Sequence, residues 1–357
     1  MKKILSIILT FGILLGCVSL LSGCGGKKTT LYVYNWGQYI SEGEDDSLNV
    51  IAAFEEKYPD IDVKYSTYDS NETMYAKLKN GGITVDVIIP SDYMIARMIN
   101  EGMLEKLNFD NIPNYQYIDE AYKNLAHDPK NEYSVPYTWG TAGIIYNSKY
   151  VDEADVTGWE LLWNEKYKGK ILMFDNSRDA FGIAQYLLGY DVNTTDKTEL
   201  QACAAKLKEQ KPLVQQYVMD QVFTSMENEE AYIAPYYAGD YLTMAASNPD
   251  LKFYLPEQGF NLFVDSMCIP TCCQEKEAAE KFINFLCEPE ICAQNMEFLE
   301  YSVPLSAAKE FMDPETVNDP VAYPDPELLK HGTVFGLLPE DITRYMESLF
   351  MEVRNDG

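Results

Sequence analysis

One short stretch, residues 31–39, constrains the fold of this chain most strongly. It reads Leu-Tyr-Val-Tyr-Asn-Trp-Gly-Gln-Tyr, in which apolar residues alternate as in a β-strand until Gly37 breaks the pattern. A strand, a break and a following helix pattern form a corner of an α/β domain, where ligands bind just beyond the strand ends. We expect a binding site beside Trp36, Gln38 and Tyr39, although the two aromatic residues would also suit a cap on the core.

Short strand patterns alternate with helix patterns along the rest of the chain, which indicates an α/β fold. A length of 357 residues exceeds one ordinary hydrophobic core and predicts two domains. We expect strands at residues 61–65, 85–90, 143–147, 171–174, 232–235 and 260–269. We expect helices at residues 49–58, 74–80, 94–101, 159–163, 180–189, 200–209, 277–286, 291–298 and 340–353.

Two motifs at the first corners carry a resemblance to a known family. Residues 34–39 (Tyr-Asn-Trp-Gly-Gln-Tyr) and residues 65–78 (Tyr-Ser-Thr-Tyr-Asp-Ser-Asn-Glu-Thr-Met-Tyr-Ala-Lys-Leu) resemble the spermidine/putrescine-binding proteins of bacterial ABC transporters. The second run is too long and too specific in its order for chance. Similar stretches extend the resemblance over essentially the whole chain after the leader; they are residues 90–93, 133–140, 264–266 and 322–325.

The resemblance implies a two-lobed periplasmic-binding-protein fold of type II, in which a hinge joins two α/β lobes and a ligand cleft lies between them. Hinge closure around a ligand is a known switching mode of such folds. The chain would cross between lobes near residues 138–141 and 260–266. The expected first lobe is discontinuous, the second is inserted into it, and a C-terminal helix packs on both; the ranges are 31–138 plus 266–325, 139–265 and 326–357.

The candidate cleft residues are mainly carboxylates and aromatics. They are Trp36, Gln38, Tyr39, Ser91, Asp92, Tyr93, Asn176, Asp179, Tyr237, Asp240, Phe263, Asp265 and Tyr301. Ammonium groups need acceptors when they are buried, and aromatic faces attract a cation by roughly 0.5–2 kcal/mol each. A linear polyamine meets these conditions. An amino acid would need an arginine for its carboxylate, and Arg178 is expected to pair with Asp175 or Asp179 instead.

Several positions bear on the choice of polyamine through the resemblance. Family members normally carry Ser or Thr and then an acid after the tryptophan, whereas Gly37 and Gln38 stand here, so Asp92 would have to compensate. Putrescine-type relatives share Asp240 and Phe263 with this chain, while spermidine-type relatives have Ser and Trp there and Asp in place of Asn176. Phe335 also replaces a polar residue of the spermidine type. The resemblance therefore favours a diamine without excluding spermidine.

The N-terminus has the pattern of an export signal. Lys2 and Lys3 precede an apolar run, and Leu-Ser-Gly-Cys at residues 21–24 resembles the lipobox of bacterial lipoproteins. We expect residues 1–23 to be a signal peptide, Cys24 to carry lipid and residues 24–30 to form a tether. The protein would then be held at the outer face of the cytoplasmic membrane, within the periplasm if the cell has an outer membrane. Simple secretion and an uncleaved anchor are the alternatives.

Charge and cysteine content exclude several classes of partner. The net charge is −28, and removal of residues 1–23, whose only charges are Lys2 and Lys3, makes it −30, which argues against nucleic acid and anionic lipid surfaces. Six cysteines follow Cys24, without the spacing of a zinc site, and we expect buried free thiols. They are Cys203, Cys268, Cys272, Cys273, Cys287 and Cys292. We expect no cofactor and no metal.

Three other functions remain open from the sequence. A ferric-ion-binding protein of the same fold could use Tyr236 and Tyr237 with Asp240. A glycosidase could use Asp240 and Asp265 as an acid/base pair, but only two histidines and no hydrolase motif are present, so we expect no enzyme. A polyamine sensor without transport would have the same sequence features. The expected arrangement is a monomer that binds a polyamine and delivers it to a permease and ATPase.

Overall fold

The computed structural model describes residues 28–355, so the expected signal peptide, Cys24 and most of the tether lie outside the described residues. The strands are β1 (Thr29–Trp36), β2 (Ile61–Tyr68), β3 (Val87–Ile88), β4 (Ser134–Asn147), β5 (Ile171–Phe174), β6 (Val214–Val218), β7 (Ile233–Tyr237), β8 (Leu251–Tyr254), β9 (Phe260–Cys268) and β10 (Gly332–Thr333). The α-helices are α2 (Val50–Lys57), α3 (Asn71–Asn80), α4 (Asp92–Asn100), α5 (Ser177–Leu188), α6 (Lys197–Gln210), α7 (Gln221–Glu227), α8 (Ala238–Ser247), α9 (Lys276–Leu286), α10 (Pro289–Leu299), α11 (Pro314–Val317), α12 (Pro326–Leu329) and α13 (Glu340–Asn355).

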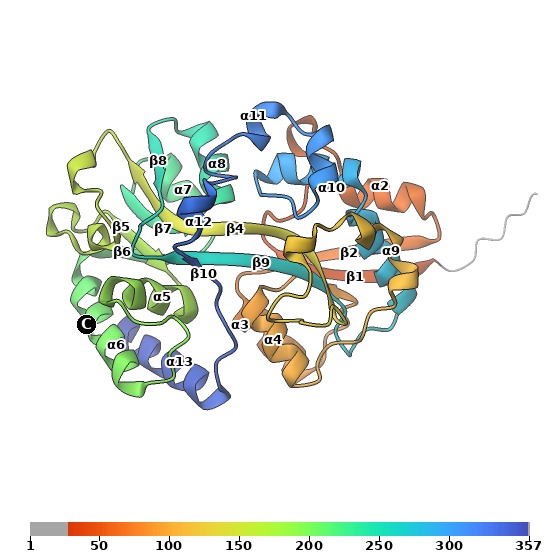
Figure 1. Ribbon diagram of the computed structural model, residues 1–357, viewed down its shortest axis with the longest axis horizontal. Helices are drawn as coiled ribbons and strands as arrows, with labels where there is room; N and C mark the ends of the chain where they lie inside the picture. The colour runs from red at the N-terminus through yellow and green to blue at the C-terminus, as the bar shows by residue number, and fades with distance from the viewer. Residues whose placement is uncertain (1–27, 356–357) are drawn as a thin grey trace, which may run out of the picture.

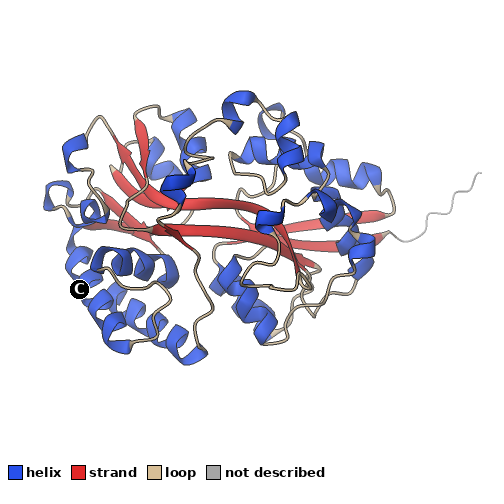
Figure 2. Ribbon diagram, in the orientation of Figure 1, coloured by secondary structure: helices blue, strands red, loops and turns tan. Residues whose placement is uncertain are grey.

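Two long strands connect the two halves of the molecule. The sheet order is β2-β1-β3-β9-β4-β7-β5-β6, with β8 on β4 and β10 on β9. In Figure 1, β4 and β9 run side by side from one half to the other, and they pair antiparallel. We call the half with β1–β3, α2–α4, α9 and α10 the first lobe, and the half with β5–β8, α5–α8 and α13 the second lobe. Helices flank the strands on both faces (Figure 2).

Each lobe has its own apolar core. Trp159, Phe174 and Phe181 are buried in the cluster of the second lobe. Phe54 and Phe282 are buried in a first-lobe cluster, with their ring centroids 5.0 Å apart. Separate cores let the lobes move as units about the strands that join them.

The strand directions bring the functional corners together. β1 and β3 are parallel, β3 is antiparallel to β9, and β7 is antiparallel to β4 and parallel to β5. The carboxyl ends of β1 and β3 in the first lobe and of β5 and β7 in the second lobe therefore point toward the middle of the molecule, while β4 and β9 run from one lobe into the other. Loops and helix starts that follow parallel strands meet at such an edge.

Several sequence expectations need correction. The expected new strand at residues 143–147 is the second part of the continuous strand β4. Of the expected strand at residues 85–90, only the two residues of β3 are in a strand. Residues 159–163 form a 3₁₀ helix rather than an α-helix. β6, α7, α8 and β8 were not expected at all.

The C-terminal segment ends on the second lobe. The face of α13 that includes Ile342, Met346, Leu349 and Val353 is buried, and the helix packs against α5 and α6. Glu347 of α13 also acts on Arg97 and Glu72 of the first lobe, so the helix packs mainly on the second lobe and faces the first.

Two further findings concern export and redox state. No helix within residues 28–355 is long and apolar enough to cross a bilayer. The six cysteines in that range are free; four are buried, Cys272 is exposed and Cys273 is partly exposed. The expectation of buried thiols therefore fails for Cys272.

Candidate ligand-binding cleft

A cavity of about 50 Å³ lies where the corners of the two lobes meet. It is lined by residues that follow β1, β3 and β6, by the end of β7 and by β9. Eight of the thirteen predicted site residues are in its wall. The lining residues are Trp36, Gly37, Tyr39, Ser91, Met219, Asp220, Tyr236, Tyr237, Asp240, Phe263, Asp265 and Tyr301. The narrow space favours a slender ligand.

Asp265 on β9 is the most deeply buried carboxylate in this wall, with 4% of its surface exposed. Its Oδ2 accepts a hydrogen bond of 2.9 Å from the hydroxyl of Tyr39, while its Oδ1 is buried and has no partner in the described part of the chain. Burial raises the pKa of Asp265 to about 7, and the hydroxyls of Ser91 and Tyr39 oppose that shift. A buried acceptor without a donor is costly, so this oxygen is suited to an incoming ammonium group.

Asp240 in the first turn of α8 provides a second carboxylate. Burial raises its pKa to about 7; the Tyr301 hydroxyl opposes the shift, and Asp220 adds to it. Asp240 on α8 and Asp265 on β9 both line the cavity, and both raise the pKa of Tyr301, which lines it too. Two carboxylates from different elements in one wall match a molecule that carries more than one positive charge.

Aromatic rings form the apolar part of the wall. The ring of Phe263 lies 5.5 Å from that of Tyr237 and 6.4 Å from that of Tyr301, both edge to face. The Trp36 Nε1 donates to the Ile89 carbonyl at 2.8 Å, which fixes the indole plane. Any Cβ atom on Gly239 would clash with the ring of Tyr301, so a glycine there lets this ring lie on the backbone. Rigid apolar walls of this kind suit a methylene chain.

Five predicted residues lie outside the cavity wall. Gln38 is exposed, has a φ of 49° and lines a neighbouring groove instead. Asp179 accepts a hydrogen bond of 2.9 Å from the hydroxyl of Tyr237, and Asn176 caps α5 by accepting from the Asp179 amide at 2.8 Å. Asp179 therefore orients a wall residue, and Asn176 orients Asp179.

The other two outlying residues follow β3. The carboxylate of Asp92 accepts from the backbone amides of Tyr93 and Val264, and burial followed by the nearby Asp265 raises its pKa to about 8. The Tyr93 hydroxyl donates to Glu72 at 2.9 Å. Asp92 thus lies behind the wall, where it cannot replace an acid at Gln38.

Residues 49–325 match the family model described as bacterial extracellular solute-binding protein. The chain belongs to this family. The spermidine/putrescine-binding periplasmic protein of Escherichia coli is 36% identical over 85% of this chain and 86% of its own length. The putrescine-binding periplasmic protein SpuD of Pseudomonas aeruginosa is 30% identical over 91% of this chain and 92% of its own length.

A solved structure supports the same placement. The spermidine/putrescine ABC transporter substrate-binding protein PotD of Streptococcus pneumoniae, 36% identical, superposes with a TM-score of 0.76 over 92% of this chain and 99% of that one. The expected family and the expected two-lobed α/β fold are confirmed by these similarities.

Four wall residues of this solute-binding protein were not selected from the sequence as polyamine-binding residues: Gly37, Met219, Asp220 and Tyr236. Gly37 and Tyr236 adjoin selected residues, so proximity alone could have found them. Met219 and Asp220 follow the unexpected strand β6, and only the sheet topology reveals them.

The structure corrects the expectation for Arg178. Its guanidinium donates to the Val192 carbonyl at 2.7 Å and to the Asn193 side chain at 2.8 Å, and it lies over the ring of Phe335. Asp175 pairs with Arg354 instead. Phe335 is buried beside Arg178 and does not line the cavity. Arg178 does not line the cavity either, so it is not placed to meet a ligand carboxylate there.

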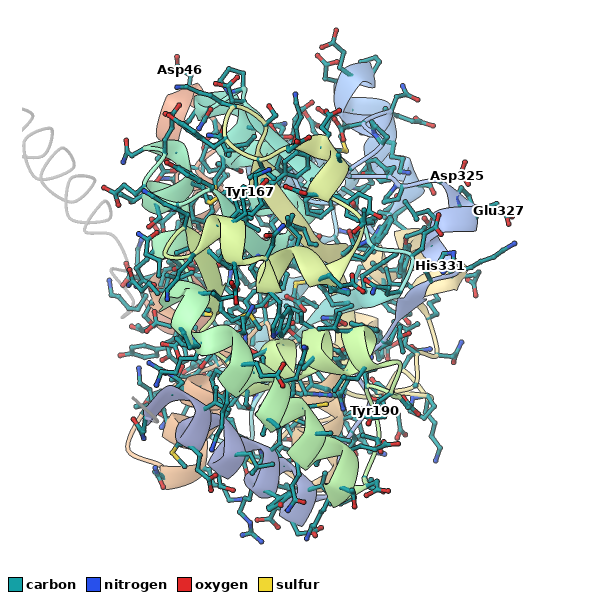
Figure 3. All side chains as sticks on the ribbon, turned by 90° about the vertical axis from the view of Figure 1, so that its left-hand side faces the viewer. Asp46, Tyr167, Tyr190, Asp325, Glu327 and His331 are labelled. Atoms are coloured by element: carbon teal, nitrogen blue, oxygen red, sulfur yellow. The ribbon has the colours of Figure 1, made fainter. Side chains whose placement is uncertain are left out.

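Metal ligation finds little support in this solute-binding protein. Within residues 28–355 no group of three His, Cys, Asp or Glu side chains is placed to hold a metal ion. Burial raises the pKa of Tyr236 and Tyr237 well above 10, which disfavours the phenolates that ferric iron needs. His331 is exposed and lies at the edge of the molecule near Asp325 and Glu327 (Figure 3).

Proposed function

We propose that this protein captures a linear polyamine in the cleft, closes around it and delivers it to an ABC importer. The observation that carries the proposal is the open Oδ1 of Asp265 at the base of a cavity with aromatic walls. A second carboxylate is that of Asp240, and within residues 28–355 no Lys, Arg or His side chain lines the cavity. The charged side chains in this wall are all carboxylates, so an anion or a zwitterion would find no counter-charge for its negative group, whereas a dication finds one for each end.

The names of the relatives support this ligand class and the transport partners. Curated proteins similar to this chain include binding proteins for spermidine/putrescine and for putrescine. The partners proposed here are therefore a permease and an ATPase of an ABC importer, with the binding protein acting as a monomer. The protein has no proposed catalytic step, and the ligand leaves it with its mass unchanged.

Putrescine is the proposed preferred ligand. Asp240 and Phe263 both line the cavity, and they are two of the positions at which the resemblance sets this chain apart from the spermidine type; the other two, Asn176 and Phe335, do not line it. A charged carboxylate near the end of a short cavity favours a terminal ammonium over the longer chain of a triamine. Discrimination is a difference of two binding free energies, so one charged contact is enough to set it.

Calorimetric titration of the protein from Lys27 onward tests this function. Putrescine, spermidine, spermine, ferric citrate and glutamate would be compared at one pH and ionic strength. We expect saturable 1:1 binding of polyamines, tightest for putrescine, and no heat of binding from ferric citrate or glutamate. Mass spectrometry of the released ligand should show an unchanged mass. Binding of ferric citrate alone, or a product of altered mass, would contradict the proposal.

The lobes are proposed to exchange between open and closed forms about β4 and β9. The proposed boundaries are 31–138 with 266–325 for the first lobe and 139–265 for the second. Thr138 pairs with Asp265 in the sheet, so the proposed partner of the ammonium group would stand at the hinge itself. A ligand that contacts both lobes favours closure because it binds the closed form better.

Lipid on Cys24 is the proposed membrane attachment. Each buried methylene of an acyl chain adds roughly 0.8 kcal/mol to membrane affinity, so two or more chains anchor a protein firmly. We predict that Cys24→Ala releases the protein or blocks its processing, while Cys17→Ala leaves it attached. Fractionation of cells followed by immunoblotting checks this. A Cys24→Ala protein that stays in membranes with its leader intact would show an uncleaved anchor.

Polyamine affinity is predicted to rise with pH through neutrality. The pKa values of Asp240 and Asp265 are each about 7 in the empty protein, because burial disfavours the charged form. An ammonium ligand binds their ionised forms and itself stays charged in this range, as lysine does. Affinity for putrescine should increase by about one to two orders of magnitude between pH 6 and pH 8, with release of protons. Titration in two buffers of different ionisation enthalpy measures both quantities.

The stability of the empty protein should change in the opposite direction. These carboxyls hold protons in the folded state at pH values where they are ionised in the unfolded chain, so their contribution to the free energy of unfolding falls as pH rises from about 4 to about 7. The gain in Tm from putrescine should therefore be larger at pH 8 than at pH 6. Equal affinity at the two pH values would contradict the proposed role of both groups.

A further inference from the structure

Asp220 reaches across the cleft from the second lobe to the first. It follows β6, which runs parallel to β5 with its carboxyl end toward the middle of the molecule, and it directly precedes α7. A Cβ atom built on Gly37, which follows β1 of the first lobe, would lie 2.5 Å from Oδ2 of Asp220. The carboxylate therefore occupies the space that a side chain at Gly37 would fill, and this contact between lobes depends on glycine.

The carboxylate of Asp220 has no hydrogen-bonding or ion-pair partner of its own within residues 28–355, although it lines the cavity. The residue as a whole is exposed while its carboxylate is partly shielded beside Gly37, so Asp220 stands nearer the mouth than Asp265, which is 4% exposed. The nearest charges that act on it are alike: burial and then Asp69 raise its pKa, and Asp220 in turn raises that of Asp240. Asp220 therefore lies near two other carboxylates, and within residues 28–355 no Lys, Arg or His side chain lines this cavity.

We propose that Asp220, together with Asp240, holds the ammonium at the mouth end of the ligand, while Asp265 holds the other end. This inference rests on the proposed function and adds to it a residue that acts only when the lobes meet. Asp220 comes close to the first lobe at Gly37, so its contact with the ligand forms on closure. A bound ammonium would also relieve the repulsion between Asp220 and Asp240, which gives the closed form with a diamine an advantage over the closed form without one.

Two ligands separate the roles of the two ends. Putrescine carries an ammonium group at each end of a four-carbon chain. Butylamine has a chain of the same length but carries only one ammonium group. We expect Asp220→Asn to weaken putrescine about 10-fold, which corresponds to about 1.4 kcal/mol, mainly through faster release, and to leave butylamine within about twofold. The isosteric asparagine breaks no hydrogen bond of the empty protein, so an unchanged Tm serves as the check on folding. Asp220→Glu should recover part of the affinity.

Asp69→Asn is the matched control. It removes the same charge from an exposed neighbour that acts on Asp220 but does not line the cavity. A loss of putrescine affinity through the general field alone would be as large in Asp69→Asn as in Asp220→Asn, and that result would overturn the proposal.

Gly37→Ala provides an independent test. Its added methyl group would push Asp220 away, so it should weaken putrescine and add little to the loss in the Asp220→Asn background. Full additivity of the two changes would also overturn the inference. If the wild-type protein binds no polyamine, the proposed function itself fails. If the wild type binds putrescine and Asp220→Asn binds it equally well, only the role of Asp220 fails.

Discussion

Asp265→Asn is expected to lower the affinity for putrescine at least 100-fold. The ammonium would lose the one buried carboxylate whose Oδ1 lacks a partner in the described chain. Removing one member of a buried charge pair typically costs about 3–5 kcal/mol, and about 2.7 kcal/mol already corresponds to 100-fold. Calorimetric titration of wild type and variant at pH 8 measures the change.

The same variant should not be less stable when empty. Asparagine keeps an oxygen that can accept the hydrogen bond from the Tyr39 hydroxyl, and it removes a carboxylate whose ionisation burial opposes. We therefore expect the Tm of the empty protein at pH 8 to stay equal or to rise, while the gain in Tm from putrescine is lost. A fall in both would indicate a damaged fold rather than a lost ligand contact.

Asp92→Asn is the control for this prediction. Asp92 is equally buried and close enough to Asp265 for the two charges to interact, but its carboxylate accepts two backbone amides behind the wall. Asparagine has one side-chain oxygen and can keep only one of these two bonds, so the Tm of the empty protein should fall. Because the lost bond lies behind the wall, affinity should still change by less than about tenfold. If Asp92→Asn proves as damaging as Asp265→Asn, or if Asp265→Asn leaves the dissociation constant unchanged, the ligand does not bind where we place it.

The first corner shows why much of the fold could be predicted. The apolar alternation of residues 31–36 and the break at Gly37 give β1 its strand and its end, and both are local properties of the chain. The capping box of Ser70 and Thr73 likewise fixes the start of α3 through residues that are close in sequence. Trp36 and Tyr39 follow such a locally specified strand end, and both line the cavity.

The misses have the opposite cause. β6 is an edge strand that reads Val-Gln-Gln-Tyr-Val, and only Val218 in it is buried, so it lacks a clear apolar alternation. Its place in the sheet is set by pairing with β5, a contact distant in sequence. Because β6 was not predicted, the corner after it, which carries Met219 and Asp220, could not be predicted either. Position in the sheet, rather than local pattern, decides such residues.

Side-chain direction was the other limit. Asp92 and Asp179 follow strand ends as predicted, but one accepts backbone amides behind the wall and the other accepts the hydroxyl of Tyr237. The sequence indicates which edge of the sheet a residue occupies, but not which neighbouring donor its side-chain oxygens accept a hydrogen bond from. Asp265 differs from both because one of its oxygens is left without a donor.

Asp240→Ser is expected to weaken putrescine much more than spermidine. Asp240 is a cavity-lining carboxylate, and serine would leave a terminal ammonium without its counter-charge. A triamine can offer a different nitrogen to the remaining acids, so it should lose less. A tenfold change in the ratio of the two affinities needs only about 1.4 kcal/mol, which one charged contact can supply. Titration of both ligands against wild type and variant measures this ratio.

The structure also predicts which of three substitutions matter for a reversed preference. The variant with Asn176→Asp, Asp240→Ser and Phe263→Trp should move preference toward spermidine. Asn176 caps α5 outside the wall, and aspartate caps equally well, so Asn176→Asp alone should leave the ratio unchanged. The double variant at 240 and 263 should therefore match the triple one. A wild type that prefers spermidine tenfold, or a triple variant with the wild-type ratio, would show that this cleft is not built for a diamine.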